Sequence, residues 1–161
     1  MKRILPILSQ KGFSLIELMV TVTILLLVMG GGIAGYLVFN EKQTVLEATN
    51  LLKTYFHKAQ SQAKTGNISS CAALAGYRVT VAGSPEVVTL QERCVDGSVG
   101  SSENETLSSS VSVTPVDVTY KVLHGGVIGA ESGLNVDVAG SNRTYRFTLT
   151  EGGEISEGDW L

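Results

Sequence analysis

The segment Lys11-Gly12-Phe13-Ser14-Leu15-Ile16-Glu17-Leu18 opens an apolar run that continues to Phe39 and sets the architecture of the whole chain. It joins a basic flank, a glycine, an aromatic residue and a single acid to a long stretch without charge. Between Leu18 and Phe39 the only clearly polar side chains are those of Thr21 and Thr23. A helix rises about 1.5 Å per residue, so this run spans about 33 Å and can cross the hydrocarbon core of a bilayer.

This start resembles the class III signal of type IV prepilins and of the pseudopilins of type II secretion systems. The resemblance covers roughly the first third of the chain and is carried by Lys11, Gly12, Phe13, Ser14, Leu15, Ile16, Glu17, Leu18 and the hydrophobic segment after them. In that family a membrane aspartic peptidase, the prepilin peptidase, cuts after the glycine, and the new amino terminus is N-methylated. The resemblance therefore implies cleavage between Gly12 and Phe13, methylation of Phe13, and a mature chain whose fifth residue is Glu17.

Glu17 places a carboxylate inside a membrane segment, which costs roughly a few kcal/mol and requires a partner. No Lys or Arg lies one helical turn away on the mature segment, so the nearest cation is the amine that cleavage frees at Phe13. In a filament, the amine of one subunit would meet Glu17 of its neighbour, which neutralises both charges and sets the axial register. The alternative is a juxtamembrane charge whose carboxylate reaches the membrane interface.

Residues 1–12 are typical of a short cationic leader. Three cations precede the apolar run, whereas its far side opens with Glu41 and Lys42. The positive-inside rule predicts a single-pass protein of the cytoplasmic membrane, with its amino terminus in the cytoplasm and its bulk outside. An uncleaved signal anchor explains this topology but not the glycine–phenylalanine junction or the acid. We expect the subunit to move from the membrane into an extracytoplasmic filament, in the periplasm or at the cell surface.

The net charge of the chain is −3, and removal of the leader with Lys2, Arg3 and Lys11 lowers it to −6. A negative chain argues against a general nucleic-acid surface. A local basic spot around Arg143 and Arg146, and with it a part in DNA uptake, is left open.

The helix is predicted to continue outside the membrane from Asn40 to Lys64 and to stop at Gly66. Apolar residues recur there at three- and four-residue spacing, which indicates a buried stripe: Val45, Ala48, Leu52, Tyr55, Phe56, Ala59 and Ala63. The glycine triplet at 30–32 predicts either close helix packing or a place where the helix unwinds in the filament. The expected organisation is a leader (1–12), a membrane and filament-core helix (13–39), an amphipathic helix (40–66) and a β-rich head (67–161).

From Gly76 onward the apolar period changes to two, which predicts strands. We expect them at 77–81, 87–92, 111–123 with a break near Pro115, 134–138 and 144–150, and around Ile155. A turn at 83–85 is predicted to return the chain from the first strand to the second, and 134–138 is predicted to pair with 144–150 in a hairpin around 139–142. The polar stretch 96–105 is predicted to be a loop. The predicted fold class is therefore α+β: a long amino-terminal helix packed on an antiparallel sheet, the order of elements found in pilin-like subunits.

Cys71 and Cys94 are the only cysteines. In an exported domain two cysteines predict one disulfide, which would join the helix–sheet connection to the end of the second strand. Two buried free thiols are the alternative.

Nothing in the sequence predicts catalysis or a cofactor. His57 and His124, the two histidines, have no metal-ligand spacing, and no nucleophile elbow is present. Some pseudopilins bind calcium in acidic loops, and two candidate groups exist here: Asp96, Glu103, Asn104 and Glu105, and Glu151, Glu154, Glu157 and Asp159. Neither has the EF-hand pattern, so solvated loop charge is the favoured interpretation and no metal is predicted.

The sequence thus predicts a structural subunit of a type IV pilus or a type II secretion pseudopilus, not an enzyme. Its partners would be the prepilin peptidase, other pilin or pseudopilin subunits and the inner-membrane assembly platform. The helix end at 59–63 and the closing strand–turn–strand resemble H-type minor pseudopilins and their minor-pilin relatives, with a major pilin as the second choice. The competing hypothesis is a monomeric, signal-anchored adhesin or binding module.

Overall fold

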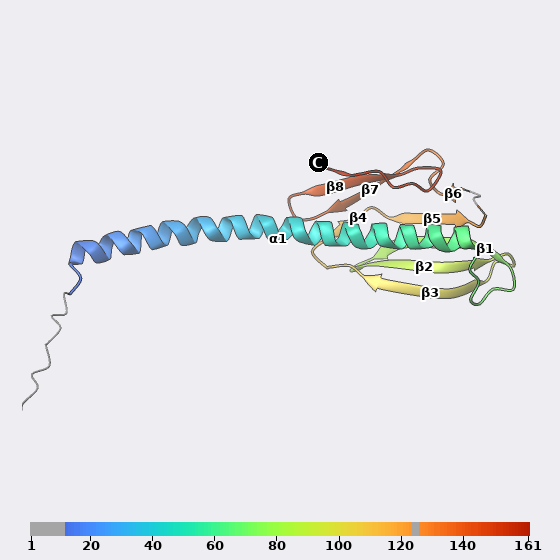
Figure 1. The fold of residues 1–161 in the computed structure, drawn as a ribbon, viewed down its shortest axis with the longest axis horizontal. Coiled ribbons are helices and arrows are strands. Elements are labelled where there is room, and N and C mark those ends of the chain that lie inside the picture. Colours follow the sequence, from blue (N-terminus) through green and yellow to red (C-terminus); the bar gives the residue numbers. More distant parts are fainter. Residues whose placement is uncertain (1–11, 124–125) are drawn as a thin grey trace, which may run out of the picture. The chain divides into compact units, whose positions relative to one another are not determined.

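The computed structural model describes residues 12–123 and 126–161, which form one long helix and nine strands (Figure 1). The chain divides into two units, Met1–Val38 and Phe39–Leu161, and the helix contributes to both. The elements are α1 (Leu15–Thr65), β1 (Leu74–Gly83), β2 (Glu86–Cys94), β3 (Val99–Thr106), β4 (Ser112–Val113), β5 (Val116–Lys121), β6 (Val127–Ile128), β7 (Leu134–Ala139), β8 (Thr144–Leu149) and β9 (Asp159–Trp160).

Helix α1 ends where the sequence predicts, and the reason is local. Gly66 has a φ of 61°, a left-handed conformation that costs a glycine little. Its N–H donates to the carbonyl oxygen of Ala63, and the N–H of Asn67 donates to that of Gln62, both at 3.3 Å. These two bonds form a Schellman motif, which satisfies carbonyl groups that the end of a helix otherwise leaves unpaired.

The predicted apolar stripe of α1 is confirmed. All seven of its residues are buried, and Val45, Leu52, Phe56 and Ala59 are fully inaccessible to solvent. They form one core with strands of both sheets. The ring of Phe56 packs edge-on against that of Phe147 in β8, with their centroids 6.1 Å apart, so this half of α1 is held by the head's own core.

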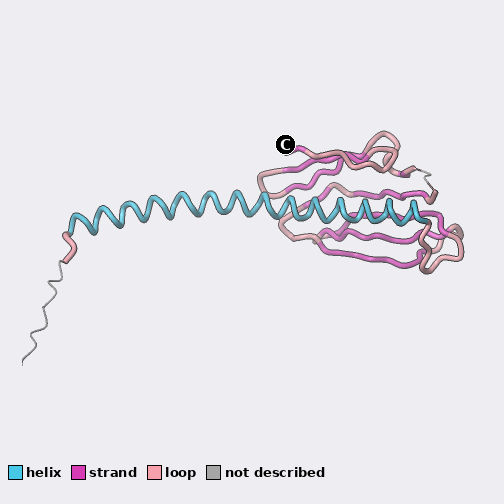
Figure 2. Tube along the Cα trace, viewed as in Figure 1, coloured by secondary structure: helices cyan, strands magenta, loops and turns pink. Residues whose placement is uncertain are grey.

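The strands form two antiparallel sheets rather than the single one that the sequence suggested (Figure 2). The first has the order β3-β2-β1-β5-β6 and the second the order β4-β7-β8-β9. The predicted hairpins are confirmed: β1 pairs with β2 around Ser84-Pro85, and β7 pairs with β8 around residues 140–143. The predicted fold class, α+β with a long helix on antiparallel strands, is correct.

Two predictions about the strands were wrong. The stretch 96–105 is not a loop, because most of it forms β3, an edge strand paired with β2. Its side chains are nearly all exposed, so it has no alternating apolar pattern, and its pairing comes from main-chain hydrogen bonds. The last strand is β9 at Asp159–Trp160, while Ile155 makes only an isolated bridge to Leu149.

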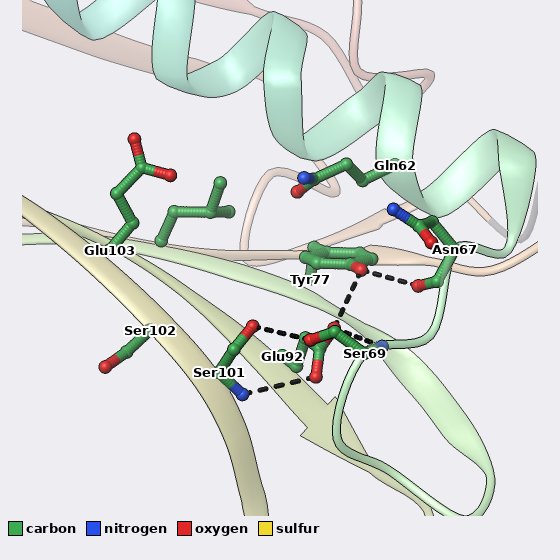
Figure 3. A pocket seen from close by; sticks show the side chains of 9 residues that line it. Gln62, Asn67, Ser69, Tyr77, Glu92, Ser101, Ser102 and Glu103 are labelled. Carbon is green, nitrogen blue, oxygen red and sulfur yellow. Dashed lines mark hydrogen bonds between the residues drawn. The ribbon is translucent and has the colours of Figure 1, made fainter.

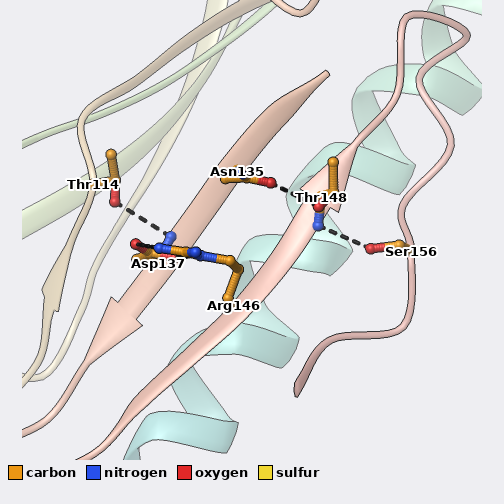
Figure 4. Close-up of polar contacts among 6 residues, drawn as sticks. All are labelled: Thr114, Asn135, Asp137, Arg146, Thr148 and Ser156. Atoms are coloured by element: carbon orange, nitrogen blue, oxygen red, sulfur yellow. Dashed lines mark hydrogen bonds and ion pairs between the residues drawn. The ribbon is translucent and has the colours of Figure 1, made fainter. Parts of the chain in front are cut away.

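The outer face of the second sheet carries a ladder of polar contacts (Figure 4). The guanidinium of Arg146 in β8 donates two hydrogen bonds to the carboxylate of Asp137 in β7, at 2.6 and 2.7 Å. Thr148 bonds to Asn135 through its hydroxyl and to Ser156 through its N–H. Because Arg146 is paired in this way, the basic spot that the sequence left open is largely neutralised on this face.

Candidate processing and assembly site

Ser14 caps the first turn of α1. Its Oγ accepts a hydrogen bond from the N–H of Glu17 at 3.3 Å, and its carbonyl oxygen accepts one from the N–H of Leu18 at 3.2 Å. Serine at the cap with glutamate three residues later is the capping-box pattern, which is a further signal in the sequence for the start of a helix. A carboxylate in the first turn also interacts favourably with the helix dipole. Glu17 therefore has a local role besides the predicted intermolecular one.

The predicted cleavage junction lies outside regular secondary structure. Gly12 and Phe13 precede α1, and the side chain of Phe13 is 80% exposed. A Cβ added at Gly12 would meet no atom within 4 Å. Lys11, the basic residue of the signal, lies outside the described residues. The peptide bond between Gly12 and Phe13 is therefore sterically accessible.

The first half of α1 presents apolar side chains on every face. The large hydrophobic residues described from Leu15 to Phe39 are all exposed, and an 18-residue window has a mean hydropathy of 2.2 with none of it buried. Its two threonines bond back to the helix itself: Thr21 Oγ1 donates to the carbonyl of Leu18 at 2.9 Å and Thr23 Oγ1 to that of Met19 at 2.8 Å. By length and composition this helix could cross a membrane.

Glu17 is the one acidic or basic residue between Leu15 and Phe39, and it is exposed. Within the described part of the chain, no Lys or Arg forms a salt bridge with it. A carboxylate in an apolar medium without a cation is costly, and among residues 12–123 and 126–161 no salt bridge offsets that cost for Glu17.

A family model described as a prokaryotic N-terminal methylation motif matches residues 7–33. The match contains the junction, the cap, the acid and most of the apolar run. The chain therefore carries the amino-terminal methylation motif of the type IV pilin and pseudopilin family, followed by a long helix and antiparallel sheets. Proteins of this family are structural and not enzymes, and their motif implies processing by prepilin peptidase and assembly with other pilins. The apolar helix is consistent with anchoring of the prepilin in a membrane before assembly. No curated protein and no solved structure matches the chain.

Among the strands after α1, a buried carboxylate holds the connection between α1 and β1 (Figure 3). Glu92 in β2 is 2% exposed. It accepts hydrogen bonds from the N–H and hydroxyl of Ser69, the N–H of Ser70, the N–H of Ser101 and the hydroxyl of Tyr77, at distances of 2.7–3.2 Å. One side chain thus joins the connection, β1 and β3.

The electrostatics of this cluster follow from burial. Burial raises the pKa of Glu92, but the hydrogen bonds from Ser69, Ser101 and Tyr77 outweigh that effect and leave the pKa below its usual value. For Tyr77, burial and the adjacent carboxylate act in the same direction and raise the pKa to about 12. Gly100 in β3 has no side chain for a steric reason, since a Cβ there would collide with the carboxylate of Glu92. Sequence analysis missed this cluster, although Glu92 follows Val88 and Leu90 at two-residue spacing and so lies on the buried face of β2.

The predicted disulfide is confirmed. Cys71 and Cys94 are bonded, with their Cα atoms 5.4 Å apart, and both are buried. The bond ties the same α1–β1 connection to the end of β2, as the sequence indicated. The connection is thus fixed by a covalent bond on one side and by the Glu92 cluster on the other.

Replacing both cysteines with serine is expected to lower the free energy of unfolding by about 3 kcal/mol, because a loop of 23 residues is no longer closed in the unfolded chain. Urea unfolding of the full chain in detergent, followed by the fluorescence of Trp160, measures this. Trp160 is the only tryptophan and packs against Tyr145 in the head, with ring centroids 5.2 Å apart. An unfolding midpoint equal to that of the oxidised wild type would contradict the prediction.

A second carboxylate joins α1 to the β7–β8 turn. Glu41 accepts hydrogen bonds from the N–H of Asn142 at 2.5 Å and from its side-chain amide at 3.3 Å. These bonds lower the pKa of Glu41. A Cβ at Gly140 would come within 3.0 Å of both Glu41 and Val45, so glycine allows the turn to approach the helix. The sequence analysis used Glu41 only as a charge at the far side of the apolar run.

The acidic residues considered as calcium ligands either bond to other groups of the protein or lie apart from one another. Asp96 accepts hydrogen bonds from Ser98 within its own turn, and Glu103 pairs with Lys58 of α1. Across residues 12–123 and 126–161, no three acids, histidines or cysteines gather as metal ligands. His57 is exposed on α1, whereas His124 lies outside the described residues.

Proposed function

We propose that this chain is a structural subunit of a type IV pilus or a type II secretion pseudopilus. Prepilin peptidase cuts it between Gly12 and Phe13, Phe13 is N-methylated, and the new amine pairs with Glu17 of a neighbouring subunit. The observation that carries this proposal is the start of α1: an accessible Gly12–Phe13 junction, then a carboxylate that forms no salt bridge with any described Lys or Arg, then an exposed apolar helix.

The proposed organisation follows from the same features. Residues 1–12 are the leader, 13–39 the membrane and filament-core helix, 40–66 the amphipathic helix, and 67–161 the extracytoplasmic head. The prepilin is held in the cytoplasmic membrane with its amino terminus in the cytoplasm, and the assembly platform moves it into the filament. Burial of the apolar helices against one another replaces the lipid that covered them.

Mass spectrometry of the mature protein tests the processing step. In cells that contain a prepilin peptidase, the expected amino-terminal peptide begins with N-methylated Phe13 and lacks residues 1–12. The same chain expressed without the peptidase is the control and should keep its leader. An intact amino terminus in both strains would exclude processing and would favour a signal-anchored adhesin or binding module.

The finer assignment, to an H-type minor pseudopilin or a related minor pilin, is supported by the resemblance of the helix end and the closing strands. It predicts a subunit present in few copies per filament, whereas a major pilin forms most of the filament mass. Quantitative mass spectrometry of sheared filaments distinguishes the two, and the neighbouring genes distinguish a pilus, a secretion system and a DNA-uptake machine.

A further inference from the structure

One sheet edge of the head differs from the others in length. Of the four edge strands described, β4, β6 and β9 contain 2 residues each, whereas β3 contains 8. Short edges offer little template for another strand, which is one way that proteins avoid unwanted pairing. Strand β3 lacks that protection, and every residue in it except Gly100 is exposed.

The pairing of β3 with β2 shows which main-chain groups point outward. The N–H of Leu107 donates to the carbonyl of Glu86 at 2.8 Å. Two and four residues further along the ladder, Val88 lies opposite Glu105 and Leu90 lies opposite Glu103. Hydrogen-bonded pairs alternate along an antiparallel ladder, so the main chain of Ser102, Asn104 and Thr106 faces away from β2. Among residues 12–123 and 126–161, none bonds to these outward groups.

The side chains beside this edge form an acidic groove. Glu103 and Glu105 lie on the helix side of β3, since Val88 and Leu90 opposite them are buried. A cavity of about 170 Å³ separates α1 from the end of β3. Its lining combines an apolar floor with two carboxylates: Ala48, Leu51, Glu47 and Glu105, with Thr44, Thr106, Leu107 and Ser108. Neither Glu47 nor Glu105 has a salt bridge within the described parts of the chain.

We propose that the β3 edge binds an extended segment of a partner polypeptide that carries Lys or Arg at alternate positions. The segment adds a strand antiparallel or parallel to β3 and bonds to the main chain of Ser102, Asn104 and Thr106. Every second side chain of an added strand, about 4.8 Å from β3, faces α1. A long cationic side chain there lays its stem along Leu51 and places its charge between Glu47 and Glu105.

The edge can be tested at one residue whose N–H points outward. Proline at Asn104 removes that N–H without removing any bond to β2, a position where an edge strand tolerates proline. The probe is a fluorescein-labelled peptide of alternating threonine and lysine, titrated against the full chain in nonionic detergent. We expect Asn104→Pro to weaken binding roughly tenfold, while Asn104→Ala, the matched control, binds within about twofold of wild type.

A second set of measurements separates strand addition from charge alone. A peptide of the same composition with its lysines contiguous should bind roughly tenfold more weakly, because only alternation places each cation on the helix side. Thr106→Pro should repeat the effect of Asn104→Pro, and the double variant Glu47→Gln, Glu105→Gln should weaken the alternating peptide. Failure of the wild type to bind, equal binding of both peptides, or proline variants that bind like Asn104→Ala would each overturn the proposal.

Discussion

Replacing Glu17 with alanine is expected to abolish filament assembly while leaving cleavage and methylation at Phe13 unchanged. In the proposed filament the variant leaves the amine of the neighbouring Phe13 unpaired among apolar helices. Removing one partner of a buried ion pair costs about 3–5 kcal/mol, which lowers the affinity between subunits by a factor of roughly 150 to 4,000. Electron microscopy of sheared filaments and mass spectrometry of the membrane fraction measure the two results separately.

The cap at Ser14 provides the control for this experiment. Ser14→Ala removes the bond to the N–H of Glu17 but keeps the carboxylate, at a cost to the helix start of about 1 kcal/mol. We expect this variant to form filaments. If Ser14→Ala abolished assembly as fully as Glu17→Ala, the carboxylate would be acting through the start of its own helix. Normal filaments from Glu17→Ala would remove the intermolecular pair from the mechanism altogether.

The fold could be predicted wherever burial leaves a periodic pattern in the sequence. The stripe from Val45 to Ala63 was correct in every member because an amphipathic helix must place its apolar residues at that spacing. The hairpin of β7 and β8 followed from alternation. Strand β3 was missed because both of its faces are exposed. Its pairing with β2 depends on main-chain hydrogen bonds, which leave no pattern in the order of side chains.

The same distinction between local and long-range features applies to the candidate functional site. The disulfide between the two cysteines could be predicted because they are the only pair in the sequence, and it is confirmed. The junction at Gly12 and the acid at Glu17 are local features of the sequence, and their roles stay predictions. The partners of Glu92 and Glu41 could not be found, because each carboxylate binds segments that the fold brings from elsewhere in the chain. Asn142, for example, lies about a hundred positions after the carboxylate it binds. A pattern of neighbours in sequence contains no information about such pairs.

The Glu92 cluster gives the largest expected effect on stability. Glu92→Leu would fill the space with an apolar group and leave the N–H groups of Ser69, Ser70 and Ser101 without their acceptor. Buried donors that lose a charged acceptor cost about 1–3 kcal/mol each, less where water can reach them. These serines are themselves exposed, so we expect a total loss of about 4 kcal/mol. Urea unfolding of the full chain in detergent, followed by Trp160 fluorescence, measures it.

The pH dependence of unfolding tests whether the charge of Glu92 is the cause of this stabilisation. The pKa of Glu92 is lowered in the folded chain, so its carboxylate contributes stability above the unfolded pKa, which is about 4.3. That contribution is lost as the pH falls through the folded pKa. Glu92→Gln keeps the shape but cannot ionise, so the difference in unfolding free energy between wild type and Glu92→Gln should shrink from pH 7 to pH 3. A difference that stayed constant would mean that packing, and not the charged acceptor, holds the α1–β1 connection in place.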